Sequence, residues 1–86
     1  MKKSRTSVGW IYYKTTTEEI FRLGGRGICD ECNEFQRDGG YLIPVLNHWQ
    51  CEKCFNKWQN YAHYYPEDEA IEQQYVKYYE SILPLT

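Results

Sequence analysis

Two Cys-x-x-Cys pairs constrain the fold of this chain more than any other feature. The sequence reads Cys29-Asp-Glu-Cys32, then eighteen residues, then Cys51-Glu-Lys-Cys54, and the two pairs use all four cysteines. This separation is typical of four-cysteine zinc sites. A zinc ion takes four thiolates in a tetrahedron at about 2.3 Å, and each pair supplies two sulfurs from one tight turn. The spacing therefore predicts one structural zinc ion bound by all four cysteines.

Other uses of paired cysteines are weaker interpretations. Disulfides belong to oxidising compartments, and the basic start of the chain lacks the apolar stretch of a secretory signal peptide. We therefore expect a reducing, cytoplasmic setting. A thioredoxin-like redox pair belongs to a larger α/β fold. Iron also binds four thiolates, and the sequence leaves it open as the alternative metal.

The length of the chain suggests that the metal is needed for folding. A single domain of 86 residues buries only a small core, and a structural metal is a common staple for such domains. Zinc binding is worth roughly 10–16 kcal/mol in small zinc-finger peptides, which is comparable to the total stability of an ordinary domain. The nine Tyr, three Trp and three Phe residues can fill the core and leave a surplus for an adhesive surface.

The charge disfavours a nucleic-acid-binding surface. Ten basic and 12 acidic residues give a formal net charge of −2, whereas phosphate binding needs a clustered basic face. Basic residues gather near the N-terminus, and residues 67–80 are acidic. We interpret both ends as solvated faces.

The N-terminal part predicts a flexible segment followed by a strand. Residues 1–7 are polar and are expected to be a flexible terminus. The run Val8–Tyr13 is rich in β-forming residues and predicts a short strand with Trp10 and Tyr12 on one face.

Three helices and one hairpin complete the predicted elements. The capping-box pattern of Thr16 and Glu19 predicts a helix over Thr17–Leu23. A second helix is predicted over Cys51–Tyr61 and a third, after Pro66, over about Glu67–Leu83. The hairpin consists of a strand Tyr41–Val45, a turn at Leu46-Asn47 and a returning strand His48–Gln50. The predicted fold class is a small α+β domain over residues 1–86, with strand and short helix at 8–25, a four-cysteine unit at 27–64 and a C-terminal helix at 66–83.

The order of knuckle, β-hairpin and helix resembles the treble-clef zinc finger. The resemblance covers residues 27–64, with the second cysteine pair at the start of the helix. The C-x2-C-x18-C-x2-C spacing and the Trp49-Gln-Cys-x-x-Cys54 entry to the helix are similar to those of GATA-type fingers. GATA fingers also carry a basic tail and basic loops, which this chain lacks. The resemblance therefore implies the fold and a structural zinc ion, but not DNA binding.

A second resemblance is to the bacterial anti-sigma factors of the Gin type. Those small proteins have paired Cys-x-x-Cys motifs, then an acidic segment, then a helix with Tyr-Val-Lys. Here Pro66-Glu-Asp-Glu69 and Tyr75-Val-Lys-Tyr-Tyr79 follow the cysteine pairs in that order. This resemblance implies a protein that binds and sequesters a protein partner.

No residue pattern indicates catalysis. His48 is either a packing residue or a substitute ligand three residues before Cys51, and His63 has no serine, cysteine or carboxylate placed with it. Four cysteine ligands leave the metal no open position. We therefore expect a binding module and not an enzyme.

The favoured function is protein–protein interaction, as a small regulator or inhibitor. Tyr and Trp side chains anchor protein interfaces, and the candidate partner-binding residues are Trp10, Tyr12, Tyr75 and Tyr79. The alternative is nucleic-acid binding, with aromatic stacking on a single strand and the Lys2–Arg5 arm on phosphates. We expect no membrane and no small-molecule substrate.

Overall fold

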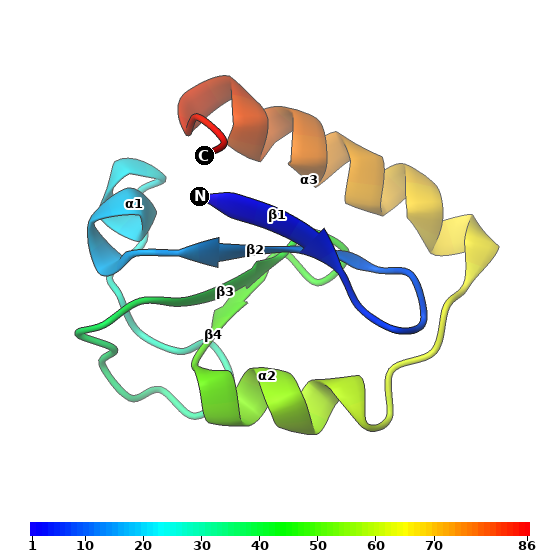
Figure 1. Ribbon diagram of the computed structural model, residues 1–86, viewed down its shortest axis with the longest axis horizontal. Helices are drawn as coiled ribbons and strands as arrows, with labels where there is room; N and C mark the ends of the chain where they lie inside the picture. The colour runs from blue at the N-terminus through cyan, green and yellow to red at the C-terminus, as the bar shows by residue number, and fades with distance from the viewer.

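One antiparallel sheet joins the two halves of the chain. The computed structural model describes residues 1–86, and its four strands lie in the order β1-β2-β3-β4. Their bounds are Lys2–Arg5 (β1), Ile11–Thr15 (β2), Gly40–Ile43 (β3) and His48–Gln50 (β4). Because β2 pairs with β3, the N-terminal part and the four-cysteine part share one hydrogen-bonded sheet (Figure 1).

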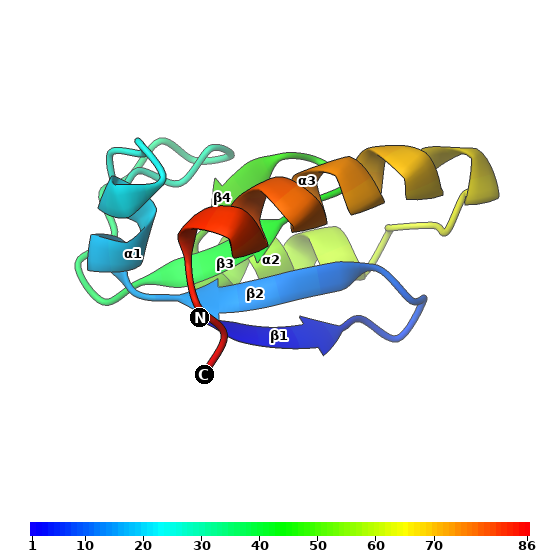
Figure 2. The same cartoon turned by 90° about the horizontal axis from the view of Figure 1, so that it is seen from above.

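The helices cover both faces of this sheet. Their bounds are Thr17–Arg22 (α1), Glu52–Gln59 (α2) and Glu69–Ile82 (α3), with a 3₁₀ turn over Pro66–Asp68 (η1) before α3. In Figure 1 the sheet lies between α3 above and α2 below, and Figure 2 shows α1 beside the end of β2. The predicted α+β class is confirmed. The helix α3, the sheet and the helix α2 form three layers.

Local sequence signals account for the start of α1 and for the turn of the hairpin. The Thr16 side chain accepts a hydrogen bond from the Glu19 N–H at 3.1 Å, and the Glu19 carboxylate accepts one from the Thr16 N–H at 2.8 Å. This is the reciprocal capping box that the sequence predicted. At the hairpin, β3 ends before Pro44, and Asn47 has a left-handed φ of 51°, which asparagine tolerates better than most residues.

The first seven residues differ from the prediction of a flexible terminus. Lys2–Arg5 forms β1, in which Lys3 lies opposite Tyr13, and the Met1 side chain is buried in the core. The Lys3 ammonium group also binds the Glu80 carboxylate at 2.7 Å. Polar side chains here face solvent while their backbone pairs with β2, so composition did not reveal the strand. The predicted strand Val8–Tyr13 starts later, at Ile11, because the preceding residues form the β1–β2 turn.

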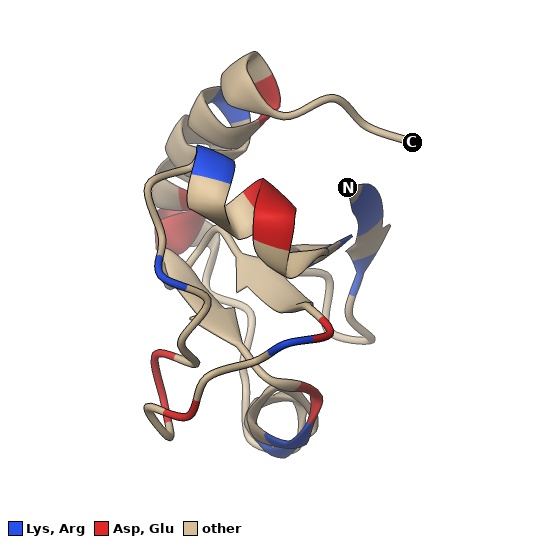
Figure 3. Cartoon of the chain, turned by 90° about the vertical axis from the view of Figure 1, so that its left-hand side faces the viewer, with Lys and Arg blue, Asp and Glu red and all other residues tan.

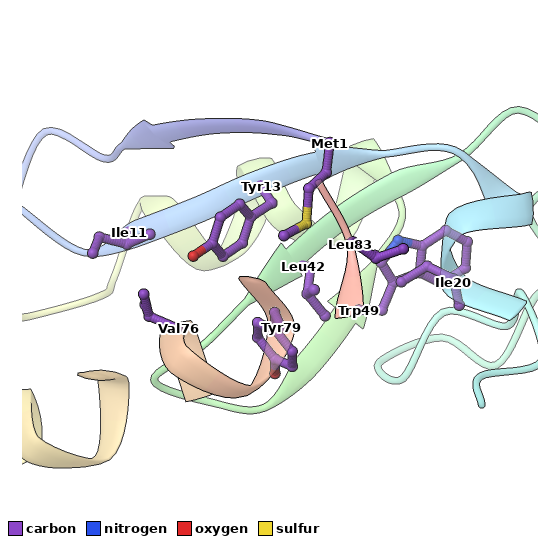
Figure 4. Packing of buried hydrophobic residues seen from close by; sticks show 9 residues of the cluster. All are labelled: Met1, Ile11, Tyr13, Ile20, Leu42, Trp49, Val76, Tyr79 and Leu83. Atoms are coloured by element: carbon purple, nitrogen blue, oxygen red, sulfur yellow. The ribbon is translucent and has the colours of Figure 1, made fainter. Parts of the chain in front are cut away.

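The larger core lies between the sheet and α3 (Figure 4). Ile11 and Tyr13 of β2 meet Val76 and Tyr79 of α3, and the rings of Tyr13 and Tyr79 pack edge to face. Burial of these side chains is the main favourable term in the folding of this layer. The cluster comprises Met1, Ile11, Tyr13, Ile20, Leu42, Trp49, Val76, Tyr79 and Leu83.

A second core lies between the sheet and α2. It comprises Trp10, Ile43, Phe55 and Trp58. Two of the candidate partner-binding residues are therefore core residues, because Trp10 and Tyr79 are each only 2% exposed. Both faces of the sheet are covered, so these two rings lie in the core, and Trp10 also contributes to the lining of an apolar surface cleft. Tyr12 and Tyr75 are half-buried.

One carboxylate is buried beneath α3. Glu72 is 1% exposed, and its Oε2 atom accepts a hydrogen bond from the Ile11 N–H at 2.7 Å. Burial raises the pKa of the Glu72 carboxyl group above its usual range, and this bond and the charge of Arg5 only partly oppose the shift.

The substitution Glu72→Gln is expected to reduce the pH dependence of stability. Because the folded-state pKa is raised, the contribution of Glu72 to stability is complete below the ordinary pKa of about 4.3 and is lost as the pH rises through the raised value. Glutamine stays neutral and can still accept the Ile11 N–H bond. The free energy of unfolding of the variant, relative to wild type, should therefore increase with pH.

Urea unfolding of the metal-loaded proteins between about pH 5 and pH 8 measures this difference. The exposed Glu18→Gln substitution serves as a control. A difference between Glu72→Gln and wild type that stays constant across this range would contradict the expectation.

Candidate metal centre

The four cysteines come together in the fold. Their Sγ atoms all lie within 4.8 Å of one another, and those of Cys32 and Cys51 are 4.0 Å apart. A tetrahedron with Zn–S bonds of about 2.3 Å has edges of about 3.8 Å. The clustering that the sequence predicted is confirmed, and the separations fit one metal ion.

The first cysteine pair lies in a tight knuckle. The Cys32 N–H donates to the Cys29 sulfur at 3.5 Å, and the Asn33 N–H donates to the Cys29 carbonyl at 2.8 Å. Asn33 has a left-handed φ of 64°, which reverses the chain so that the Cys29 N–H can donate to the Glu34 carbonyl. The turn thus aims both sulfurs toward one point.

The second pair lies at the start of α2. Cys51 is the N-cap residue, and its sulfur accepts a hydrogen bond from the Cys54 N–H at 3.5 Å. The partial positive charge of a helix N-terminus favours thiolates over thiols. Both pairs therefore use the same sulfur-accepting bond from the second cysteine to the first.

Asp30 connects the first knuckle to the sheet, a role that the sequence analysis missed. Its N–H donates to the Trp49 carbonyl at 2.8 Å, and its carboxylate accepts from the Trp49 N–H at 2.8 Å. Because Trp49 lies two residues before Cys51, this pair of bonds sets the position of the first knuckle relative to the second. No sequence signal distinguishes Asp30 from the exposed acids around it.

The substitution Asp30→Ala is expected to lower the free energy of unfolding of the zinc-loaded protein by about 1–2 kcal/mol, because it removes a charged acceptor of a backbone N–H. Asp30→Asn keeps an acceptor and should lose less. Denaturant unfolding with excess zinc measures both. The exposed Asp38→Ala in the next turn is the control, and equal stabilities for Asp30→Ala and Asp38→Ala would refute the role of Asp30.

The thiols differ in acidity. Burial tends to raise the pKa of Cys29, but backbone N–H donors, with the largest contribution from Cys32, outweigh it and lower the pKa to about 7. Burial and thiol protons shared with the other sulfurs raise the pKa of Cys54 to about 12. Four ionised sulfurs in one place require a cation, and a bound divalent metal deprotonates such ligands.

The donor set is made of sulfur alone. His48 lies outside the group of possible ligands, so the alternative of a substitute histidine ligand is not supported. The backbone carbonyl of His63 accepts the Trp10 indole N–H at 2.9 Å. Cys32 is exposed, and a hollow of about 510 Å³ adjoins it and the second pair. Four thiolates suit zinc or iron, and both fit this geometry.

A second surface feature lies beyond the C-terminal end of α2. It is an apolar cleft of about 280 Å³, and seven of the nine residues that line it are hydrophobic. Exposed tyrosines form part of its lining, with Tyr61 60% and Tyr65 49% exposed. We call it the tyrosine cleft, and its nine lining residues include Trp10, Trp58, Tyr61, Ala62, Tyr65 and Asp68. The sequence predicted that Tyr61 ends the helix that begins at Cys51, but α2 ends at Gln59, so Tyr61 and Tyr65 lie in the segment that connects it to the 3₁₀ turn.

The helices and loops carry charges of both signs, whereas the charged residues of β1 are all basic. Figure 3 shows basic and acidic segments alternating over the helices and loops. Of the basic residues in β1, Lys3 binds Glu80 and Arg5 donates to the Gly9 carbonyl at 2.9 Å. The Lys2–Arg5 segment is therefore a strand with two engaged cations.

No family model, curated protein or solved structure matches this chain. No helix of this structure combines the length and the apolar character that crossing a lipid bilayer requires. Function is therefore inferred from the residues and their geometry.

Proposed function

We propose that this chain is a non-catalytic protein-interaction module, a small regulator or inhibitor that binds and sequesters a protein partner. Its scaffold is stabilised by one structural zinc ion in a treble-clef finger over residues 27–64. The observation that carries the proposal is the tyrosine cleft, where exposed aromatic side chains surround an apolar hollow. Exposed patches of this kind mark interaction sites, and tyrosines are frequent anchors in them.

The arrangement of the cysteines supports a structural role for the metal. Four thiolates complete a tetrahedron and leave no position for a reacting water. The first knuckle, the β3–β4 hairpin and α2 follow one another in the treble-clef order. Metal analysis of the purified protein tests the identity of the ion. We expect one zinc per chain and a colourless solution, whereas a coloured protein with stoichiometric iron would overturn the zinc assignment.

The charges favour a protein partner over nucleic acid. Non-specific nucleic-acid binding depends on cations that are free to meet phosphates. In the N-terminal segment Lys3 and Arg5 already bind groups of this chain, and the formal net charge is −2. Nucleic-acid binding remains the second candidate because aromatic side chains also stack on bases.

An affinity pull-down from a lysate of the source organism tests the proposal. The zinc-loaded chain serves as bait, with and without nuclease, and the retained molecules are identified by mass spectrometry. We expect a specific protein that is retained in both conditions. Retention that disappears with nuclease, together with a salt-sensitive gel shift on single-stranded oligonucleotides, would favour the alternative.

A further inference from the structure

We propose that the tyrosine cleft binds one large apolar side chain of a partner segment that carries a Lys or Arg residue next to it. This inference rests on the proposed function and deepens it, because it names the site and the chemistry of the partner.

The size of the cleft suits a single anchor. Its volume of about 280 Å³ lies at the lower limit of small-molecule pockets, which span roughly 300–1,000 Å³. One aromatic or branched aliphatic side chain fills much of such a space. Interfaces commonly concentrate their binding energy in one buried anchor of this type.

The floor of the cleft is fixed and its rim is exposed. Trp58 is 6% exposed and belongs to the core beneath α2, and the indole N–H of Trp10 is bound to the His63 carbonyl. Tyr61 and Tyr65 supply large exposed rings at little cost in conformational entropy. A rigid floor with an aromatic rim is therefore preorganised for an apolar guest.

One indole N–H among the residues that line the cleft makes no hydrogen bond within the chain. The indole N–H of Trp10 donates to His63 and that of Trp49 donates to the Thr15 hydroxyl, whereas that of Trp58 has no acceptor in this protein. A backbone carbonyl of a bound segment can accept this hydrogen bond. A peptide offers such a group beside every side chain.

The charge beside the cleft selects a cationic neighbour for the anchor. Asp68 lines the cleft and is the N-cap residue of α3, but its side chain makes no capping hydrogen bond. Neither Asp68 nor the adjacent Glu67 takes part in either of the two ion pairs of the chain. The lysines of α2, Lys53 and Lys57, line the hollow beside the cysteines instead. The edge of the cleft at Asp68 thus carries a negative charge without an ion-pair partner, which favours a Lys or Arg on the bound segment.

A displayed library of random peptides, selected against the zinc-loaded chain, tests the proposal. We expect enriched peptides to share an aromatic or branched aliphatic residue next to Lys or Arg. Fluorescein-labelled copies of these peptides then give affinities by fluorescence polarisation. Replacing the anchor with Ala, or the basic residue with Glu, should weaken binding about tenfold or more.

Variants of the chain locate the binding site. Ala62→Trp fills the cleft, the double variant Tyr61→Ala and Tyr65→Ala removes its rim, and Asp68→Lys reverses its charge. Each should weaken peptide binding about tenfold. The controls are the exposed Tyr78→Ala on α3 and Glu18→Lys in the first turn of α1, which should leave the affinity unchanged. Near-UV circular dichroism confirms that each variant is folded. If Ala62→Trp does not fold, the rim and charge variants still test the proposal.

The outcomes separate this inference from the proposed function. Enriched peptides that bind the cleft variants as tightly as wild type, or that lack the apolar and basic pair, would overturn the cleft assignment and leave a module that binds through another surface. A selection without enriched peptides would overturn the cleft assignment as well. If the lysate pull-down also retained no protein, the proposed function would fail with it.

Discussion

Replacing Cys51 with serine is expected to unfold the whole domain. Cys51 is 8% exposed, follows β4 directly and is the N-cap of α2, so its sulfur links the sheet to a helix through the metal. The loss of one thiolate removes much of a binding free energy that reaches roughly 10–16 kcal/mol in small zinc fingers. Ordinary domains have a total stability of about 5–15 kcal/mol. The expected result is the loss of near-UV circular dichroism and of cooperative thermal unfolding, even with excess zinc.

The exposed Lys53→Ser, in the same turn of α2, is the matched control and should unfold like wild type. A chelator added to wild type should reproduce the effect of Cys51→Ser. Cobalt(II) provides an independent measurement, because its visible absorption reports a tetrahedral thiolate site. The expectation fails if the variant keeps a native spectrum and a cooperative transition without metal.

Trp10→Ala is expected to lower the free energy of unfolding by about 3–5 kcal/mol, the usual cost of truncating a buried aromatic residue. Trp10 packs with Ile43, Phe55 and Trp58, and its indole N–H binds the His63 carbonyl. Its ring also packs against that of Tyr64 at a centroid distance of 4.6 Å. The substitution therefore leaves a cavity and an unpaired carbonyl. Denaturant unfolding of the zinc-loaded protein measures the loss.

Tyr61→Ala is the comparison for this experiment. Tyr61 is 60% exposed, so its truncation should change stability by no more than about 0.5 kcal/mol. We expect Trp10→Ala to act mainly on stability and Tyr61→Ala to act mainly on partner binding, because Trp10 is buried and Tyr61 is exposed. A Trp10→Ala variant with the stability of wild type and a weakened partner interaction would restore the surface role that the sequence suggested.

Features encoded by neighbouring residues were predictable from the sequence. Each Cys-x-x-Cys pair folds as a local turn, and the capping box of Thr16 and Glu19 acts within one helical turn. Local signals of this kind gave the cysteine cluster and the positions of the helices and of the hairpin. The α+β class followed from these elements.

Features that depend on distant residues were not predictable in this way. β1 forms because β2 offers it a backbone edge, which the polar side chains of Lys2–Arg5 do not encode. The burial of Trp10 and Tyr79 depends on α2 and α3 covering opposite faces of the sheet. Asp30 acquires its role only when Trp49 approaches it. An aromatic residue looks the same in a sequence whether it lies in a core or on a binding surface.

The position of the sheet between two helices limits how this chain can diversify. A strand with one solvated face accepts substitutions at every second residue, but in β2 only Lys14 is exposed. A saturation mutagenesis scan of β2 should therefore find Lys14 as its single permissive position. Evolutionary drift in such a molecule is confined to its connecting segments, and the residues between α2 and α3, which include Tyr61 and Tyr65, offer the widest freedom to acquire new specificities.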